Sequence, residues 1–213
     1  MSRYLNCILC GAITDEYFQF RDIDYYRCSY CRSVMMHPYF YPEPEMEKAR
    51  YDQHQNDVHD PAYRGFVKPM VERITGYYPP ESSALDYGAG HGPVITEMLK
   101  ESGYQPELFD IYYHNDRTVL SRTYDFIFCS EVIEHFRDPR REFVLLRSLL
   151  KPKGSLFCMT ELFNDELYFE KWHYKNDPTH LFFYHEKALY WIKDYFSFKN
   201  LHIDNRVIHF TVD

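Results

Sequence analysis

A glycine-rich turn at residues 84–92, Ala-Leu-Asp-Tyr-Gly-Ala-Gly-His-Gly, constrains the fold of this chain more than any other feature. The apolar pair Ala84 and Leu85 predicts the end of a strand, and residues 94–100 predict a helix. Pro93 suits the first helical position, where its missing N–H would have no partner. Glycine permits a positive φ and lets a ligand approach bare backbone N–H groups. The segment therefore predicts a strand–turn–helix unit that can hold a ligand, with a ligand-free turn as the alternative.

The acidic residue before the turn and the spacing of the glycines limit the classes of ligand that the turn could bind. Asp86 precedes Gly88, Gly90 and Gly92, which gives the pattern D-x-G-x-G-x-G. Dinucleotide-binding enzymes use G-x-G-x-x-G, with the pyrophosphate at the N-terminus of the following helix. The spacing here is one residue tighter, and the helix again directs the positive end of its dipole toward the turn.

A second carboxylate follows at the end of the next predicted strand. Residues 105–112 hold an apolar strand, and Asp110 lies 24 positions after Asp86. In nucleotide-binding α/β units a carboxylate at this place accepts hydrogen bonds from the ribose hydroxyls. The alternatives are an ordinary strand-end aspartate, or Glu107 within the strand as the ribose ligand. Only 13 residues separate Asp110 from Tyr124, so we expect a shortened connection with a vestigial third strand or helix.

The chain then continues to alternate between strands and helices. Phe126–Cys129 is a continuous apolar run, as expected of a strand that is buried on both faces. Further along, the pattern predicts a helix over 138–150, a strand over 155–160, a helix over 185–195 and two last strands within 200–212. This order predicts a mostly parallel α/β sheet over residues 81–213.

Four cysteines near the N-terminus form two C-x₂-C pairs. Cys7 and Cys10 make the first pair, Cys28 and Cys31 make the second, and 17 residues lie between the pairs. This spacing is typical of a tetrahedral Cys₄ zinc site, which would be structural because protein ligands fill all four positions. A segment of about 40 residues has too little core to fold without such support. We therefore predict a zinc ribbon over residues 1–40, with disulfides or free thiols as alternatives.

Residues 41–80 carry several prolines and predict helices that lead into the core. Polar aromatic and amide side chains are spaced through this segment, namely Tyr51, His54, Asn56 and Tyr63. They either form a cover over a bound cofactor or pack on the domain.

Composition limits the partners. The 213 residues carry 24 basic and 32 acidic side chains, a net charge of −8, which disfavours a nucleic acid held by bulk electrostatics. No apolar run reaches the ~18 residues that a membrane span needs. The N-terminus lacks an apolar signal stretch, and six cysteines in such a chain predict a reducing, cytoplasmic location. The sequence leaves the oligomeric state open.

Four segments, taken in order, resemble the class I S-adenosylmethionine-dependent methyltransferases. They are the glycine turn, Phe109-Asp110, the run Tyr-Asp-Phe-Ile-Phe-Cys-Ser-Glu-Val-Ile-Glu-His at 124–135, and Leu-Lys-Pro-Lys-Gly at 150–154. The whole chain resembles such an enzyme with an N-terminal Cys₄ zinc ribbon. The resemblance implies a Rossmann-like, seven-stranded type of sheet, here with a shortened strand-three region.

The resemblance also assigns residues to the cofactor, S-adenosyl-L-methionine, which leaves as S-adenosyl-L-homocysteine. It implies that the glycine turn borders the methionine end, that Asp110 holds the ribose, and that Ser130 and Glu131 line the sulfonium side. The predicted cofactor-binding residues are Asp86, Tyr87, Gly88, Ala89, Gly90, Gly92, Asp110, Ser130 and Glu131.

A stretch after the fifth core strand, residues 172–184, lies where this fold carries its acceptor pocket. Trp172, Tyr174 and Asp177 are the predicted substrate-binding residues, with a structural hairpin as the alternative. Methyl transfer needs a base only if the acceptor must lose a proton, and histidine titrates in a suitable range. His135 and His180 are the predicted catalytic residues.

The favoured function is methyl transfer to a small-molecule acceptor by in-line displacement. Two alternatives remain: an RNA or protein methyltransferase that uses the ribbon for recognition, and a non-catalytic cofactor-binding protein. Neither the acceptor nor the receiving atom (O, N or C) follows from the sequence.

Overall fold

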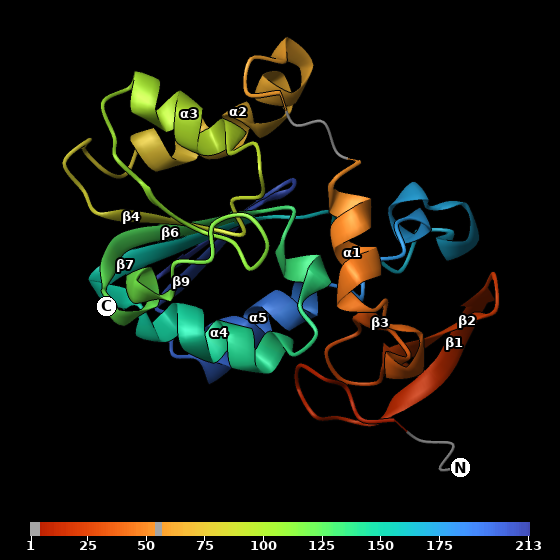
Figure 1. Cartoon of the computed structure of the whole chain (residues 1–213). Helices are drawn as coiled ribbons and strands as arrows, with labels where there is room; N and C mark the ends of the chain where they lie inside the picture. Colours follow the sequence, from red (N-terminus) through yellow and green to blue (C-terminus); the bar gives the residue numbers. More distant parts are fainter. Residues whose placement is uncertain (1–4, 54–56) are drawn as a thin grey trace.

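The computed structural model describes residues 5–53 and 57–213, which form two β-sheets (Figure 1). The larger, central sheet has the strand order β5 (Glu107–Phe109), β4 (Ala84–Tyr87), β6 (Tyr124–Ser130), β7 (Leu150–Met159), β10 (Val207–Thr211) and β9 (Asn200–Asp204). The first four strands run parallel, whereas β10 is antiparallel to both of its neighbours. The predicted α/β architecture with a largely parallel sheet is therefore confirmed.

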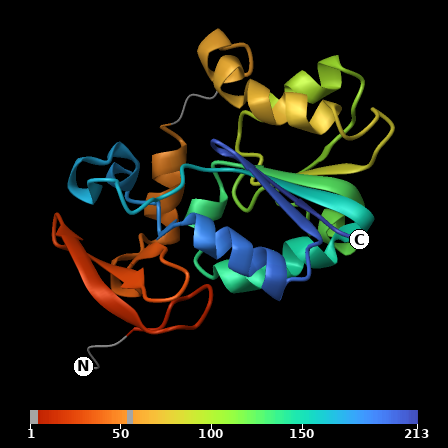
Figure 2. The same cartoon turned by 180° about the vertical axis from the view of Figure 1, so that it is seen from behind.

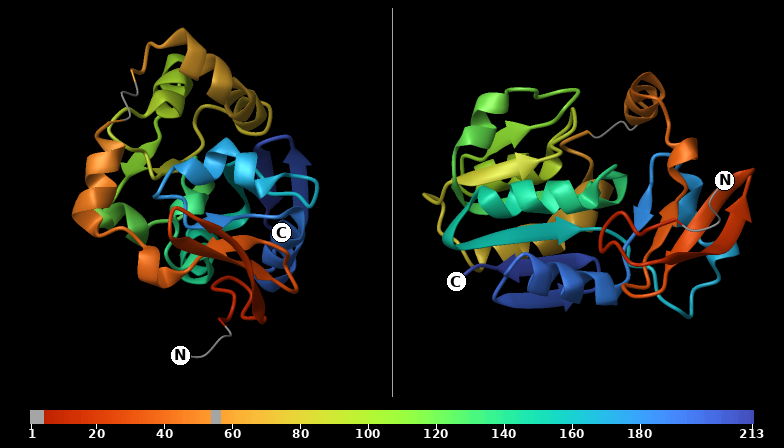
Figure 3. Two further views of the ribbon diagram at one scale, coloured as in Figure 1. Left: turned by 90° about the vertical axis from the view of Figure 1, so that its right-hand side faces the viewer. Right: turned by 90° about the horizontal axis from the view of Figure 1, so that it is seen from below.

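Helices cover both faces of the central sheet (Figures 1 and 3). Residues of α2 (Pro61–Thr75) and α3 (Val94–Glu101) share one apolar cluster with Phe126 and Phe128 of β6. Residues of α4 (Pro139–Ser148) and α5 (Glu186–Tyr195) share another with Ile127 and Cys129. Successive side chains of a strand point to opposite faces, so the continuous apolar run in β6 buries both sides.

The predicted seven-stranded sheet is wrong in its strand count, because the central sheet has six strands within the described residues. Between Asp110 and Tyr124 the chain forms an isolated bridge from Asp110 to His114 and a short 3₁₀ turn, η2 (Arg117–Ser121). The predicted shortened connection is thus observed. Thirteen residues leave no length for a helix and a further strand.

Two predicted boundaries shift by a few residues. The helix expected over 138–150 ends at Ser148, and β7 begins at Leu150 rather than at 155. The backbone N–H of Tyr124 donates to the carbonyl of Leu149 (2.8 Å), which draws this segment into the sheet. Pro93 is the N-cap residue of α3 and not its first helical residue.

The smaller, N-terminal sheet has the order β1 (Thr14–Phe20), β2 (Ile23–Cys28), β3 (Val34–Met36) and β8 (Phe182–Phe183), all antiparallel. Its fourth strand comes from the C-terminal half of the chain. Met35 pairs with Phe182, and Val34 pairs with Phe183. The N-terminal segment therefore shares its sheet with the stretch that the sequence analysis assigned to the acceptor.

One helix and four further 3₁₀ turns complete the described part of the chain. Helix α1 (Pro44–Tyr51) stands beside the segment 160–180 in views from the front and from behind (Figures 1 and 2). That segment contains η4 (Phe169–Lys171) and η5 (His173–Asn176), while η1 (Pro38–Phe40) precedes α1 and η3 (Ile133–His135) follows β6. Among the described residues, none of the helices has the length and apolar character needed to span a bilayer.

Candidate functional site

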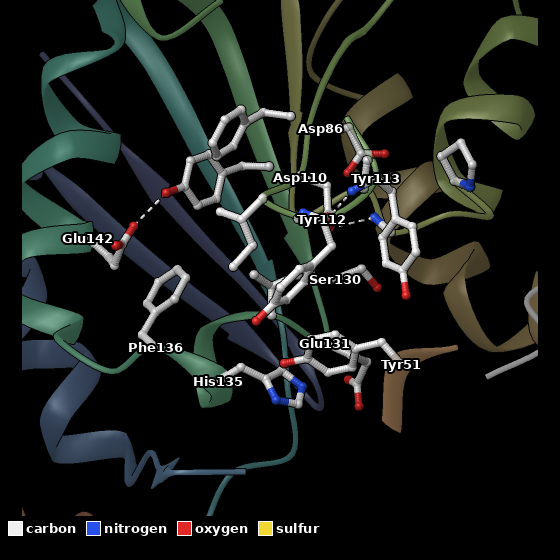
Figure 4. Close-up of a pocket in the computed structure, with 18 of the residues that line it drawn as sticks. Tyr51, Asp86, Asp110, Tyr112, Tyr113, Ser130, Glu131, His135, Phe136 and Glu142 are labelled. Atoms are coloured by element: carbon white, nitrogen blue, oxygen red, sulfur yellow. Dashed lines mark hydrogen bonds between the residues drawn. The ribbon is translucent and has the colours of Figure 1, made fainter. Parts of the chain in front are cut away.

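A cavity of about 1160 Å³ opens at the carboxyl ends of β4, β5 and β6. Ligands of open parallel sheets bind at this edge, and the volume exceeds the ~300–1,000 Å³ usual for one drug-sized ligand. Figure 4 shows Asp86 and Asp110 toward one end and Glu131 and His135 toward the other. We call these the turn end and the histidine end of the cavity.

The glycine turn forms the floor of the turn end. Gly88 and Gly90 have φ of +85° and +60°, so two of the three glycines use the conformation that glycine favours. The N–H groups of Gly88 and Ala89 donate to the carbonyl of Phe109 (2.8 and 3.1 Å), which ties the turn to β5. A Cβ added at Gly90 would meet nothing within 4 Å, so the turn leaves open space above it.

Asp110 lies across this turn, where the sequence analysis expected a ribose ligand. One carboxylate oxygen accepts a hydrogen bond from the N–H of Gly90 (3.0 Å). The other accepts from the N–H groups of Tyr112 and Tyr113 (2.8 and 3.1 Å). A carboxylate offers about four acceptor positions, so Asp110 orders the loop and retains capacity for a ligand hydroxyl.

Asp86 and Tyr87 also line the turn end. Asp86 is 5 % exposed and accepts from the hydroxyl of Thr96 (2.7 Å). Burial raises its pKa to about 7, although the Thr96 hydroxyl works in the opposite direction. Tyr87 donates to Glu142 at 2.5 Å, so this tyrosine is fixed at the edge of the cavity.

The chain enters the histidine end through a strained residue. Ser130 ends β6, and Glu131 follows with φ +53°, a value that costs a non-glycine residue about 1 kcal/mol or more. Both residues line the cavity, and their role in cofactor binding stays a prediction. Strain of this kind concentrates at functional sites.

Two buried carboxylates meet at the histidine end. The hydroxyl of Tyr174 contacts Oε2 of Glu131 (3.2 Å) and Oε1 of Glu134. Burial and the nearby Glu134 charge raise the pKa of Glu131 to about 8. Burial likewise raises the pKa of Glu134 to about 7, against the effect of the Tyr174 hydroxyl.

The two predicted catalytic histidines lie together. Their ring centroids are 4.8 Å apart, and both line the cavity. Nδ1 of His135 contacts the carbonyl of Thr179 (2.8 Å), and Nδ1 of His180 contacts the carbonyl of Tyr174 (2.6 Å). Burial lowers the pKa of His135, which favours its neutral form.

The predicted substrate-binding residues occupy different positions. Asp177 lines the cavity and pairs with Arg50 of α1 (2.8 Å). Burial would raise its pKa, but the Thr179 hydroxyl and backbone N–H outweigh burial and lower it to about 2. Trp172 and Tyr174 are each 5 % exposed and lie behind the cavity wall, because they pack in the aromatic cluster shared with the N-terminal sheet.

Two of the four proposed cover residues can be placed. Tyr51 and Tyr63 line the cavity, and the Tyr51 hydroxyl donates to Glu47 (2.8 Å). His54 and Asn56 lie outside the described residues.

Sequence reasoning missed Glu134 and Arg206. Glu134 lies three positions after Glu131 in Glu-Val-Ile-Glu-His, a spacing that could have indicated a second inward carboxylate. Arg206 lies near Glu131 (3.6 Å) and Glu161 (2.5 Å) from the turn between β9 and β10, and no local pattern predicts that approach.

The four N-terminal cysteines form a second candidate site. Their sulfur atoms all lie within 4.8 Å of one another. The backbone N–H groups of Tyr30 and Cys31 point to the sulfur of Cys28 (3.4 and 3.3 Å), an arrangement that stabilises a thiolate. The four thiols of Cys7, Cys10, Cys28 and Cys31 are free of disulfides, and four clustered sulfurs match the donor set of structural zinc.

Comparisons with known proteins agree with this architecture. A family model described as "Methyltransferase domain" matches residues 53–203. No curated protein matches the chain. The solved structures that share its fold include 1,6-didemethyltoxoflavin-N1-methyltransferase from Burkholderia thailandensis, with TM-score 0.56 and 12% identity over 93% of this chain and 99% of that one.

Two further solved structures share the fold at similar distance. Magnesium protoporphyrin IX methyltransferase from Synechocystis PCC 6803 has TM-score 0.56 and 16% identity over 79% of this chain and 94% of that one. An O-methyltransferase family protein from Burkholderia thailandensis has TM-score 0.56 and 14% identity over 78% of this chain. The match spans 61% of the length of that protein. The family match covers most of the chain, and the chain therefore belongs to the methyltransferase domain family.

Proposed function

We propose that the chain uses S-adenosyl-L-methionine to methylate a small-molecule acceptor. The observation that carries this proposal is the bond between Asp110 and the N–H of Gly90, which sets a carboxylate over an open glycine turn. The turn end would hold the cofactor, with its methionine part along residues 86–92 and its ribose on Asp110. Structures of related fold were solved with S-adenosylhomocysteine, including the toxoflavin and magnesium protoporphyrin enzymes.

The acceptor would lie at the histidine end. The cavity is large enough for a nucleoside cofactor and a second small molecule, and Ser130 lies between its two ends (Figure 4). Relatives of the same fold are named for small aromatic or macrocyclic acceptors. The acidic composition gives no support to a polyanionic acceptor.

When bound, the cofactor supplies an electrophilic methyl group on a sulfonium, whose leaving group is a neutral thioether. The chain's task is to align the acceptor with that methyl group and exclude water, which accounts for much of the acceleration in such reactions. Tyr51 of α1 and Tyr63 of α2 line the cavity on the side of these two helices. His135 and His180 line the histidine end, where their rings would contact the acceptor.

We further propose that Cys7, Cys10, Cys28 and Cys31 bind structural Zn²⁺. The clustered sulfurs and the N–H groups directed at Cys28 support this assignment. In this view residues 1–40 form a zinc ribbon, 41–80 a cover, and 81–213 the methyltransferase domain. Reduced thiols at this site require a reducing compartment, which supports a cytoplasmic location.

Calorimetric titration with S-adenosylmethionine and S-adenosylhomocysteine tests the cofactor assignment. We expect micromolar binding to the zinc-loaded chain and a loss of at least ~10-fold in Asp110→Ala, since charge-assisted hydrogen bonds are worth about 1.5–3 kcal/mol. Asp116→Ala is the matched control, because Asp116 only caps η2 through the N–H of Thr118. If the folded wild type binds neither ligand, the proposal is overturned.

A further inference from the structure

The histidine end gathers four side chains with metal-ligating atoms. Glu131, Glu134 and His135 follow β6, and His180 comes from the loop before β8. One candidate ligand atom from each of Glu134, His135 and His180 lies within 4.8 Å of the other two. Glu131 joins this group because the same Tyr174 hydroxyl contacts both carboxylates.

Each carboxylate has one oxygen that no described group satisfies. The Tyr174 hydroxyl contacts Oε2 of Glu131 and Oε1 of Glu134, whereas Oε1 of Glu131 and Oε2 of Glu134 are buried without a hydrogen-bond partner. Burying a charged oxygen without compensation costs several kcal/mol. Two such oxygens in one group therefore indicate that a positively charged ligand belongs between them.

The histidines are oriented as metal ligands usually are. A carbonyl oxygen can only accept, so Nδ1 of His135 and of His180 carries the proton in the bonds to Thr179 and Tyr174. The unprotonated nitrogen of each ring is then Nε2, the atom that can bind a metal. A backbone carbonyl that fixes the tautomer of a ligating imidazole is a common second layer of metal sites.

The charge count fits a divalent ion. Arg206 lies within ion-pair distance of both Glu131 and Glu161. With Glu134, these residues contribute three carboxylates and one guanidinium, so two negative charges remain when all are ionised. A monovalent ammonium would neutralise only half of this charge.

We propose that Glu131, Glu134, His135 and His180 bind a divalent cation of the Mg²⁺ or Mn²⁺ class. The two carboxylates are ligands that both ions prefer, and the two imidazoles, which suit transition metals, favour Mn²⁺ over Mg²⁺ within this class. This site differs from the cysteine site, whose four sulfur donors suit zinc.

The proposed site also indicates the class of acceptor, an inference that rests on the proposed function. Mg²⁺ and Mn²⁺ favour six ligands, so four protein ligands leave two positions for a chelating pair of oxygens. A molecule with two neighbouring hydroxyl groups, such as a 1,2-dihydroxybenzene, fits this requirement. The cation lowers the pKa of the hydroxyl it contacts, and the proton leaves to water. The oxygen then forms the new C–O bond as the C–S bond breaks, and the electron pair of that bond stays on sulfur.

Electron paramagnetic resonance with Mn²⁺ tests the metal site in the zinc-loaded, full-length chain. We expect one bound Mn²⁺ per chain, displaced by Mg²⁺, with an affinity lower by at least ~10-fold in Glu134→Gln and in His135→Asn. Glu142→Gln is the matched control, because it alters a cavity carboxylate that accepts a hydrogen bond from Tyr87. Its Mn²⁺ affinity should stay within about threefold of wild type.

Binding of S-adenosylhomocysteine, measured in parallel, separates the two proposals. Asp110→Ala should lose this ligand and keep Mn²⁺, while Glu134→Gln and His135→Asn should keep the ligand and lose Mn²⁺. Absence of Mn²⁺ binding in protein that binds S-adenosylhomocysteine overturns the metal site, as does unchanged binding in both variants. With Mn²⁺ bound, 1,2-dihydroxybenzene should alter the Mn²⁺ spectrum and 1,3-dihydroxybenzene should not; equal effects of the two overturn the chelating acceptor.

Discussion

The two ends of the cavity are built in different ways. The turn end consists of backbone groups from a short stretch: residues 86–92 and Asp110 are joined by hydrogen bonds from N–H groups. The histidine end consists of side chains brought together from distant parts of the chain, such as Arg50 and Asp177. A site made of local backbone can be predicted from the sequence, and it tolerates few substitutions that add side-chain volume. A site made of distant side chains depends on the packing of the residues behind it.

Crowding of the glycine turn should produce the largest effect. A Cβ at Gly88 would lie 2.5 Å from Cγ2 of Val132 at a φ of +85°, so Gly88→Ala must shift Val132 or the turn and also strains the backbone. We expect S-adenosylhomocysteine affinity to fall by ~100-fold or more and the free energy of unfolding to fall by about 2 kcal/mol. Titration calorimetry and urea denaturation measure the two quantities.

The same substitution in α2 provides the control. A Cβ at Gly65 meets nothing within 4 Å, so Gly65→Ala should stabilise the chain by about 0.5–1 kcal/mol with unchanged ligand affinity. Near-normal affinity in Gly88→Ala would show that the turn does not hold the ligand.

Removal of the proposed zinc from the cysteine site should disturb the histidine end and spare the turn end. Met36 donates to the carbonyl of Leu181 (2.8 Å), and Leu181 donates to the carbonyl of Glu134 (2.8 Å), so the N-terminal sheet supports that end directly. After chelation, or in Cys28→Ser, we expect Trp172 fluorescence to shift to longer wavelength while S-adenosylhomocysteine affinity stays within about threefold. Measurements in a Trp191→Phe background isolate the fluorescence of Trp172. A loss of S-adenosylhomocysteine affinity without a shift in Trp172 fluorescence would contradict the comparison.

Loss of one hydroxyl at the histidine end should cost more stability than its loss elsewhere. Tyr174→Phe removes the contact to Glu131 and Glu134, and we expect about 1.5–3 kcal/mol, the range for hydrogen bonds to charged groups. Tyr184→Phe removes a bond to the neutral carbonyl of Ile133 (3.0 Å) at another buried position, for which about 1 kcal/mol is expected. Urea denaturation at pH 9, above the pKa values of about 8 for Glu131 and about 7 for Glu134, compares the two variants with both carboxylates ionised. Equal losses would mean that the carboxylates do not depend on Tyr174.

The two ends should also differ in the sign of their pH dependences of stability. Native Asp86 keeps its proton up to about pH 7, while the unfolded side chain loses it near 3.8. The native state thus binds more protons between these values, and Asp86 lowers the free energy of unfolding as pH rises through this window. Asp177, with a native pKa of about 2, raises stability as pH increases from about 2 to 4.

Denaturation at several pH values checks this pair. Asp86→Asn should flatten the decline in stability between pH 4 and 7, and Asp177→Asn should flatten the rise below pH 4. Parallel profiles for Asp86→Asn and wild type would show that Asp86 is not the group that titrates.

The same contrast explains which features the sequence could predict. The glycine pattern, Asp110 and the apolar run in β6 are local signals, and each of these elements lies where it was expected. Trp172 and Tyr174 also follow a recognisable pattern, but their place behind the cavity wall depends on β8 joining the N-terminal sheet. Pairing between segments so far apart has no local signal. The missing seventh strand could be anticipated only as a short connection, because length excludes a crossover without saying what replaces it.

The pairing of β3 with β8 also has a consequence for synthesis of the chain. Met35 pairs with Phe182, which lies 147 positions later in the chain. During synthesis β3 therefore leaves the ribosome before its partner strand and forms an open sheet edge. Open edges can pair with other chains, and this one persists until β8 has been translated. Nascent chains halted before residue 182 should therefore be more prone to associate through their N-terminal sheets than completed ones.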